Sequence, residues 1–135
     1  MPERQPIRVR DVMKHAFDVV DGMDTVALAL ERMRHVETKS LIVRKRHADD
    51  EYGVVLISDI ARLVLAKDRA PDRVNIYEIM SKPVITVSPD MDIRYCARLF
   101  ARFDLSRAPV VEAGDVVGIV SLTDLVMKGM AAQQG

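Results

Sequence analysis

The sequence has a single cysteine and no long apolar run, which argues against a disulfide-stabilised protein and against a membrane-spanning one. Among its 135 residues Cys96 is the single cysteine, so no disulfide can form within the chain and a reducing, cytoplasmic location is expected. The longest apolar runs, such as Val54 to Ile57, are far too short to cross a bilayer. The first residues lead into no apolar signal segment, so we expect no secretion and no membrane partner.

An excess of charge of one sign is also missing. Twenty Lys and Arg residues are balanced by twenty Asp and Glu residues, whereas nucleic-acid-binding domains usually carry a basic excess. The basic run Arg44 to His47 is followed at once by the acidic run Asp49 to Glu51, and no aromatic residue lies between them. We therefore interpret this loop as a solvated hairpin rather than a nucleic-acid patch. Its length, two residues more than the equivalent loop later in the chain, points to a partner contact.

Catalytic and metal-binding patterns are absent as well. His15, His35 and His47 do not have the His/Cys/Asp spacing of a metal site. No nucleophile has a base at a recognisable spacing, and there is no glycine-rich loop to cradle a phosphate. We expect no enzymatic activity, no metal and no cofactor.

The sequence does contain an internal repeat. Met80 lies 67 residues after Met13, and each closes a short lead-in segment. The same offset pairs apolar residues that have helical spacing in both copies: Val26 with Ile93, Leu30 with Ala97, Met33 with Phe100 and Val36 with Phe103. After the loop the offset is 65, which pairs Gly53 with Gly118 and Asp59 with Asp124.

Each copy is predicted to fold as β-α-β-β-α, which makes the chain an α/β (α+β) protein. In the first copy we expect strands at residues 17–20, 40–44 and 52–57 and helices at 24–36 and 58–66. In the second copy we expect strands at 84–87, 107–111 and 116–120. Its first helix should begin at Ser88-Pro89-Asp90 and run to Phe103, and its last should run from about Thr123 to Gly129. Residues 67–73 read as a polar connector and Ala131 to Gly135 as a frayed tail.

The predicted strands are apolar without alternation, as in Leu41 to Val43, so both of their faces should be covered. A three-stranded unit with two helices cannot cover itself in this way. We therefore expect the two halves to pack face to face with pseudo-two-fold symmetry, and any ligand to lie in the clefts between them.

The stretch Gly118 to Leu125 turns from an apolar strand into a helix, with Ser121 and Asp124 three residues apart across the junction. A hydroxyl and a carboxylate beside the free N–H groups of a helix start suit a sugar hydroxyl and a phosphate. The alternative is that both residues only cap the helix. The residues leave this choice open for Asp124, whereas capping is favoured for Asp59, because Leu56 stands where its hydroxyl partner belongs.

Taken in order, these motifs resemble the cystathionine-β-synthase (CBS) domain. They are the Val-Met that closes each lead-in, Pro83 to Val87, Arg107 to Val111, and Gly118 to Asp124. The resemblance covers almost the whole chain as one module, with a first CBS unit at 9–66, a linker at 67–75 and a second CBS unit at 76–130. It implies a regulatory module that binds adenine nucleotides or S-adenosylmethionine and that pairs with a second module as a dimer.

The resemblance also implies a ligand site in the second copy. Ser121 and Asp124 match the family signature for ribose, and the adenine would lie against Val84, Ile85 and Thr86. Arg107 or Lys82 would face the phosphates, although Arg107 also reads as a solvated charge at a strand end. The first copy has Leu41-Ile42 where Ala108-Pro109 stands in the second, and it keeps Asp59 as a second, weaker site.

Two functions are therefore expected as alternatives. The first is a sensor that binds AMP, ADP, ATP or S-adenosylmethionine and signals to an effector protein. The second is a dimerising scaffold whose cleft holds no ligand.

Overall fold

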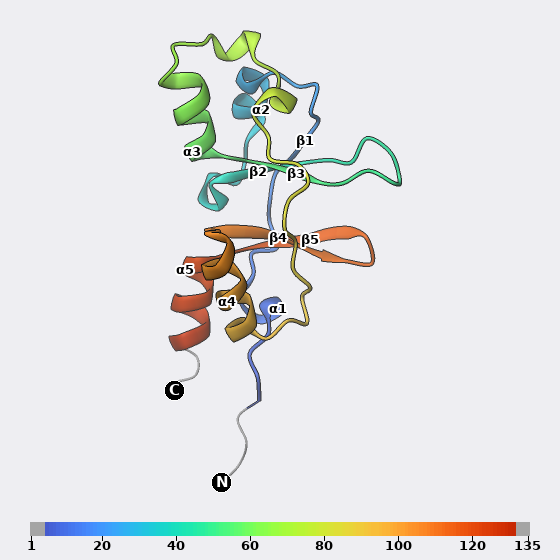
Figure 1. The fold of residues 1–135 in the computed structure, drawn as a ribbon, viewed down its shortest axis with the longest axis vertical. Helices are drawn as coiled ribbons and strands as arrows, with labels where there is room; N and C mark the ends of the chain where they lie inside the picture. The colour runs from blue at the N-terminus through green and yellow to red at the C-terminus, as the bar shows by residue number, and fades with distance from the viewer. Residues whose placement is uncertain (1–4, 132–135) are drawn as a thin grey trace. The chain divides into compact units, whose positions relative to one another are not determined.

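The computed structural model describes residues 5–131, which form two compact units (Figure 1). The first unit is Phe17–Val84, and the second unit combines the residues up to Ala16 with those from Ile85 onward. These units differ from the repeat ranges 9–66 and 76–130 of the sequence. The lead-in of each sequence copy is hydrogen-bonded to strands, helices and loops of the other copy.

The first unit contains a three-stranded sheet with its helices on one face (Figure 1). Strand β1 (Val19–Val20) pairs parallel with β2 (Ser40–Val43), and β2 pairs antiparallel with β3 (Gly53–Leu56). The helices are α2 (Val26–Arg32), α3 (Ile57–Ile60), which continues as the π-helix η2 (Ala61–Leu65), and the 3-10 turns η1 (Val36–Thr38), η3 (Pro71–Arg73) and η4 (Ile76–Glu78).

The second unit is built in the same way on two strands. Strand β4 (Arg107–Glu112) pairs antiparallel with β5 (Asp115–Ser121), and a register shift lies between Val110 and Val111. The helices are α1 (Val9–Val12), α4 (Ile93–Phe103), and α5 (Leu122–Asp124), which continues as the π-helix η5 (Leu125–Met130). The fold is therefore α/β with a repeated unit, as predicted.

Backbone hydrogen bonds confirm the repeat, because they recur at equivalent residues. Three bonds of the first unit each have an equivalent in the second, with N···O distances of 2.8–3.0 Å. The Val26 N–H donates to the Val74 carbonyl, as Ile93 does to Ile7. In the same way Ile76 donates to Asp24 as Val9 does to Met91, and Tyr77 donates to Gly22 as Arg10 does to Pro89. Val54 exchanges two such bonds with Ser81, as Ile119 does with Lys14. Each lead-in is thus attached by the same set of bonds.

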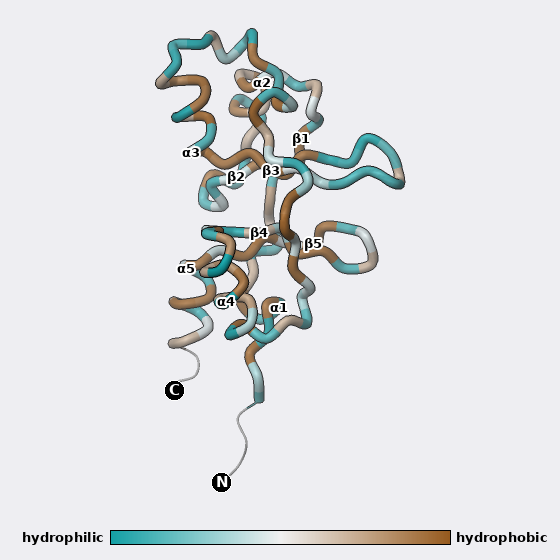
Figure 2. The backbone as a smooth tube through the Cα atoms, viewed as in Figure 1, coloured by the Kyte–Doolittle hydropathy of each residue, from teal (hydrophilic) through white to brown (hydrophobic). Residues whose placement is uncertain are grey.

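Each unit also has its own apolar core. Buried side chains of the first core include Leu41, Val55 and Ile76, and those of the second include Val9, Phe100 and Val120. Figure 2 shows the strands as hydrophobic stretches and the loop between β2 and β3 as hydrophilic. Burial of a large aliphatic or aromatic side chain contributes about 1.5–3 kcal/mol, so both units are held mainly by these clusters.

The predicted strand at 84–87 is wrong. Only Val87 forms a bridge, with its N–H on the carbonyl of Pro109 and its carbonyl on the N–H of Val111. In the first unit, Ile42 N–H donates to the carbonyl of Asp18 at 2.9 Å. The equivalent of Ile42 is Pro109, which has no N–H to donate. One rung of the ladder is therefore missing, and β4 remains an edge strand, where proline is tolerated.

The predicted helix boundaries also needed correction. Helix α2 ends at Arg32 rather than Val36, because the Asp18 carboxylate accepts the N–H groups of Arg34 (2.9 Å) and His35 (2.8 Å). Helix α4 begins after Asp92, whose side chain accepts the N–H of Arg94, and not at Ser88-Pro89-Asp90. Of the predicted apolar stripes, Leu30, Val36, Ala97 and Phe103 are exposed.

The connector is more ordered than a polar linker would be. It contains η3, and Val74 at its end is buried in the first core, where its carbonyl accepts the N–H of Val26. Residues 132–135 of the predicted tail lie outside the described residues.

Candidate functional site

The junction of β5 and α5 brings Ser121 and Asp124 into direct contact. Ser121 Oγ accepts the N–H of Asp124 at 3.1 Å, and Asp124 Oδ2 accepts from the N–H (3.1 Å) and hydroxyl (3.0 Å) of Ser121. Both residues are buried. This reciprocal capping box forms because it satisfies N–H groups that a helix start leaves without partners. Both residues therefore cap the helix, whatever else they bind.

Two lysines occupy the other oxygen of the same carboxylate. Asp124 Oδ1 lies 2.6 Å from Lys14 Nζ and 3.2 Å from Lys128 Nζ. The Asp124 side chain is 3% exposed, whereas Lys14 is 26% and Lys128 51% exposed. The carboxylate is therefore buried beneath two cations that are themselves partly exposed to solvent.

Gly118 allows Lys14 to come this close. Lys14 is held by paired backbone hydrogen bonds of 2.9 Å with Ile119, and it passes directly over Gly118. A Cβ at residue 118 would lie 2.6 Å from the carbonyl oxygen of Lys14 and 2.9 Å from Met13 Sδ. Contacts this short to a backbone atom require the backbone itself to move, so only glycine fits here.

Charge at the junction is positive overall. Arg107 is the cross-strand partner of Ser121 and interacts electrostatically with Asp124. Burial acts to raise the pKa of Asp124, but hydrogen bonds from Lys14, Ser121 and Lys128 outweigh it and leave that pKa below its ordinary value. Burial lowers the pKa of Arg107, and the charge of Asp124 opposes this shift. Three cations therefore surround one ionised acid.

The other predicted ligand residues are only partly brought together with this pair. Ala108 and Pro109 are buried in β4, directly after Arg107. Ile85 is half-buried and Thr86 exposed, and both precede Val87, which bridges to β4. Val84 belongs to the first unit. The second unit therefore brings together Ser121, Asp124 and Arg107, and Ala108 and Pro109 follow Arg107 in β4.

Asp59, at the equivalent junction of the first unit, has different surroundings. Its Oδ2 accepts the N–H of Leu56 at 2.8 Å, and its Oδ1 pairs with Arg62 at 3.1 Å. Arg62 is 68% exposed and lies on the same helical segment. Neither a hydroxyl nor a lysine reaches this carboxylate among the described residues, so Asp59 acts as a helix cap.

The sequence pattern did not identify two of the cations at the junction, Lys14 and Lys128. Lys82, which was expected to face a phosphate, belongs to the first unit and pairs there with Asp50 at 2.7 Å. The i, i+4 spacing of Asp124 and Lys128 is a local signal that could have identified Lys128. Lys14, 110 residues from Asp124 in sequence, left no such signal.

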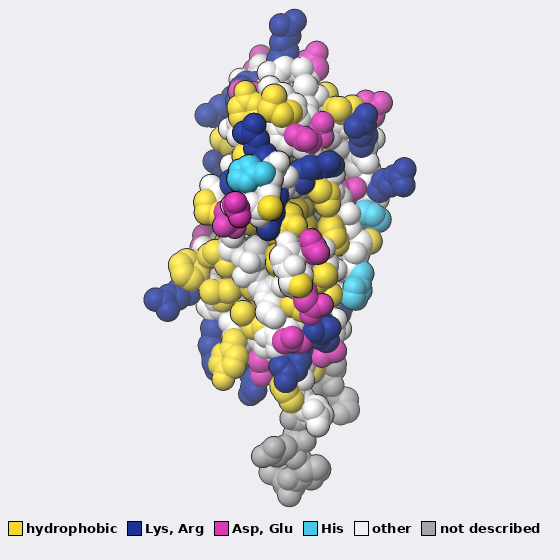
Figure 3. Space-filling model, turned by 90° about the vertical axis from the view of Figure 1, so that its right-hand side faces the viewer, with side chains coloured by type: hydrophobic (Ala, Val, Ile, Leu, Met, Phe, Trp, Pro, Cys, Tyr) yellow, Lys and Arg dark blue, Asp and Glu magenta, His cyan; other side chains and the backbone are white. Residues whose placement is uncertain are grey.

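Other reactive groups do not form a site. Cys96 is buried, and desolvation raises the pKa of its thiol to about 11. Within residues 5–131, no group of His, Cys, Asp and Glu has the geometry of a metal site. None of the described helices is both long and apolar enough to span a membrane. On the face drawn in Figure 3, acidic and basic side chains are interspersed, so neither sign dominates it.

Comparisons with known proteins agree on one family. The family model of the CBS domain matches residues 76–130. Protein MK0525 of Methanopyrus kandleri is 31% identical over 113 residues, which are 81% of this chain and 57% of MK0525. CBS domain-containing protein YhcV of Bacillus subtilis is 30% identical over 123 residues, which are 91% of this chain and 86% of YhcV. The chain thus spans little more than half the length of MK0525.

Solved structures are similar over most of the chain. The hexameric CBS-CP12 protein from bloom-forming cyanobacteria has a TM-score of 0.90 and 34% identity, covering 97% of this chain and 77% of that one. The CBS domain pair of protein MJ0100, in complex with 5′-methylthioadenosine and S-adenosyl-L-methionine, has a TM-score of 0.77 and 23% identity. It covers 95% of this chain and 99% of that one.

Proposed function

Because this chain belongs to the CBS-domain family, we propose that it is a regulatory module that binds an adenosine-containing ligand at the Ser121–Asp124 junction. CBS pairs are regulatory modules, which favours this function over catalysis. The observation that carries the proposal is the buried carboxylate of Asp124, with a serine hydroxyl at one oxygen and two partly exposed cations at the other.

Ribose is the part of the ligand that suits Asp124. Two ribose hydroxyls can donate to the carboxylate in place of Lys14 and Lys128, while Ser121 keeps its capping bond. A hydrogen bond to a charged group contributes about 1.5–3 kcal/mol net. Because the lysines are partly exposed, their ammonium groups can return to water, and the ribose hydroxyls replace the hydrogen bonds that the carboxylate loses.

Phosphate is the part that suits the displaced lysines. With ribose on Asp124, the ammonium groups of Lys14 and Lys128 and the guanidinium of Arg107 face a ligand that carries negative charge. S-adenosylmethionine carries a sulfonium cation, which this arrangement repels. We therefore favour AMP, ADP or ATP, and we expect a methylthioadenosine-type ligand to bind more weakly.

The comparison with MJ0100 supports the adenosine part only. That protein shares the fold at a low identity, and its own CBS pair holds ligands of the adenosyl class. A ligand regulates only when it binds two conformations with different affinity. Here a bound nucleotide would exchange the contacts of Lys14, and Lys14 belongs to the lead-in that α1 begins. We propose that this exchange is passed to an effector protein.

Thermal-shift and calorimetric titrations with AMP, ATP and S-adenosylmethionine test this function. Unfolding temperature should rise with AMP or ATP concentration, and Asp124→Asn should weaken binding about a hundredfold, since two charge-assisted hydrogen bonds are lost. Asp59→Asn is the matched control and should leave binding unchanged. Lys14→Met should weaken AMP but not adenosine. Nucleotide binding that survives Asp124→Asn would move the site elsewhere, and no binding at all would refute the sensor.

Self-association is the second candidate, and exposed apolar side chains of the second unit favour it. Tyr95 and Phe103 on α4 are 60% and 51% exposed, and Met127 and Met130 on η5 are 65% and 53% exposed. Exposed apolar side chains can contribute to interaction sites, and the similar CBS-CP12 protein is hexameric. We propose a homodimer, which sedimentation velocity would detect. Tyr95→Lys combined with Met127→Lys should then produce monomers.

A further inference from the structure

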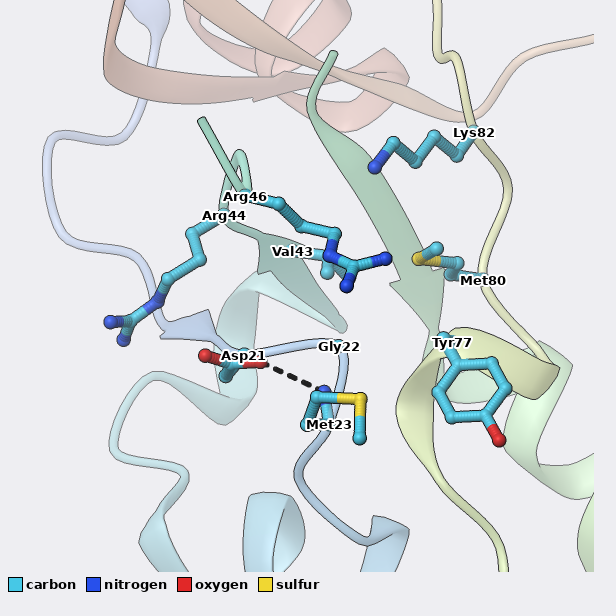
Figure 4. A pocket seen from close by; sticks show the side chains of 9 residues that line it. All are labelled: Asp21, Gly22, Met23, Val43, Arg44, Arg46, Tyr77, Met80 and Lys82. Carbon is cyan, nitrogen blue, oxygen red and sulfur yellow. Dashed lines mark hydrogen bonds between the residues drawn. The ribbon is translucent and has the colours of Figure 1, made fainter. Parts of the chain in front are cut away.

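A cavity of about 320 Å³ is lined only by residues of the first unit (Figure 4). It opens where β1 and β2 end, and the segment from Tyr77 to Lys82 closes its other side. The lining residues are Asp21, Gly22, Met23, Val43, Arg44, Arg46, Tyr77, Met80 and Lys82. Because β3 runs antiparallel to β2, the Asp59 junction at the end of β3 lies at the opposite end of this sheet.

The cavity combines positive charge with apolar surface. Neither the Arg44 nor the Arg46 side chain makes an ion pair with any residue that the structure describes, and both are exposed. In Figure 4 the Arg46 guanidinium lies over Val43 and points toward Met80, whereas Arg44 extends away from them. Arg46 is therefore the cation best placed to bind an anion inside the cavity.

The remaining charges at the cavity are already occupied. Lys82 pairs with Asp50 at 2.7 Å, and Asp50 also accepts the N–H of Arg46 at 2.8 Å. The Asp21 carboxylate accepts the N–H of Met23 at 2.8 Å. The Lys82–Asp50 pair is only 21% and 15% exposed, so it holds the Arg46 loop against the segment from Tyr77 to Lys82. The loop is largely exposed, as the prediction of a solvated hairpin had it, and this ion pair anchors it.

Apolar groups supply the rest of the lining. Met23 and Tyr77 are 64% and 50% exposed, and Met80 is half-buried. An exposed tyrosine ring beside two thioethers offers an adaptable surface for a flat, apolar group. Small-molecule sites typically combine such surfaces with a few polar groups that fix orientation.

The second unit has no such combination at the equivalent place among its described residues. The equivalents of Tyr77, Met23 and Lys45 are Arg10, Asp90 and Glu112. Arg10 binds both acids there, with Nε 3.1 Å from Asp90 and Nη2 3.3 Å from Glu112. In the second unit the position is thus closed by ion pairs. In the first unit Met23 and Lys45 stand in place of the two acids, and Tyr77 stands in place of the arginine. These replacements provide no acidic partner for Arg46.

We infer that this cavity of the first unit is a binding site for a small organic anion, with a phosphate or carboxylate on Arg46 and a flat aromatic body against Tyr77, Met23 and Met80. The site is independent of the nucleotide proposed at Asp124. It places a second ligand next to the longer of the two hairpin loops.

Phenyl phosphate and benzoate are the probes, because each joins an anion to a ring; inorganic phosphate and phenol carry one half each. In ¹H–¹⁵N spectra of the full chain, at least one ring-bearing anion should shift the amides of Gly22, Met23 and Tyr77 in a saturable way. Each half-probe should bind at least about tenfold more weakly. Response to phenyl phosphate alone, or to both anions, distinguishes a phosphate from a carboxylate ligand.

Arg46→Met should weaken the ring-bearing anion about tenfold or more, since the charged hydrogen bonds are lost. Arg98→Met removes the same charge from an exposed position on α4 of the second unit and should change nothing. Tyr77→Ala should weaken the same probe and leave inorganic phosphate unaffected. Unsaturable shifts, binding that survives Arg46→Met, or inorganic phosphate binding as tightly as phenyl phosphate would overturn the inference.

Discussion

The two strand–helix junctions share a backbone and differ in chemistry. Asp124 at the end of β5 has a serine hydroxyl and two lysines. Asp59 at the end of β3 has a leucine in place of the serine and an exposed arginine of its own helical segment. The repeat therefore conserves the helix cap and varies what surrounds it. Function in such a fold is carried by side chains placed on a common frame.

At the end of each sheet opposite the junction, it is the first unit that has the candidate binding site. There the second unit is closed by Arg10 with Asp90 and Glu112, while the first unit keeps a cavity around Arg46. Cations outnumber the acid at the junction of the second unit, whereas in the first unit the cation without an acidic partner among the described residues, Arg46, lies at the opposite end of the sheet. The proposed nucleotide site and the proposed organic-anion site are a consequence of this division.

The largest expected effect on stability concerns the glycines in front of the two junctions. Gly118→Ala would set a Cβ 2.6 Å from the carbonyl oxygen of Lys14, so the backbone must move, and we expect a loss of about 3 kcal/mol. At Gly53, the equivalent residue, a Cβ would lie 3.1 Å from the flexible Met80 Sδ and 3.2 Å from the Ser81 oxygen. Gly53→Ala should cost about 1 kcal/mol.

Urea unfolding of both variants measures this difference. Gly118→Ala should also disturb the contact between Lys14 and Asp124, which Gly53→Ala cannot do, because Lys14 lies in the other unit. Equal costs for the two variants would show that the lead-ins are held equally loosely in both units.

A smaller effect, of about 2 kcal/mol at pH 7, is expected for Asp124→Asn, because charge-assisted bonds to two lysines are lost. The folded pKa of Asp124 lies below its ordinary value of 3.8. Its ionised form therefore stabilises the folded chain above about pH 4, and this stabilisation disappears as the pH falls through the folded pKa. The difference in unfolding free energy between wild type and Asp124→Asn should shrink between about pH 5 and pH 2.

Asp59→Asn serves as the control for this titration. Its partner Arg62 is 68% exposed, and ion pairs with a solvated partner contribute at most about 1 kcal/mol. The cost of Asp59→Asn should accordingly be smaller at pH 7. A difference between wild type and Asp124→Asn that stays constant down to about pH 2 would mean that the carboxylate is not stabilised in its charged form.

The smallest expected effect on stability concerns the backbone hydrogen bond that Pro109 of β4 cannot donate. Pro109→Ala supplies an N–H where Ile42 has one in the first unit, and Ile85 is the equivalent of Asp18, whose carbonyl accepts the Ile42 N–H. The new hydrogen bond contributes about 0.5–1.5 kcal/mol, and the loss of proline in the unfolded chain costs about 0.4–1 kcal/mol, so stability should barely change. Hydrogen exchange should nevertheless show a protected amide at residue 109. Rapid exchange there would contradict the proline explanation.

Much of the fold could be predicted because its signals are local. Apolar strands at 40–44, 52–57, 107–111 and 116–120 were placed correctly to within about two residues, and the 67-residue offset predicted equivalent bonds that the structure contains. The Ser-x-x-Asp spacing also predicted the contact between Ser121 and Asp124, since a helix start brings residues three apart together.

The features that failed depend on residues far apart in sequence. Val84 to Val87 has the composition of a strand, but a strand needs a partner, and Pro109 cannot donate to it. Helix α2 ended early because the Asp18 carboxylate competes for its N–H groups. Neither the missing strand at Val84 to Val87 nor the early end of α2 can be predicted from the periodicity of a single segment.

The sequence by itself determined the repeat, the CBS family and the helix-capping pair Ser121 and Asp124, because each is written in neighbouring residues or in their regular spacing. Only the tertiary structure decided which unit each lead-in joins, that Lys14 lies on Asp124, and that Arg46 faces a cavity. Those outcomes arise from hydrogen bonds and ion pairs between distant segments, whose partners are chosen by packing rather than by local pattern.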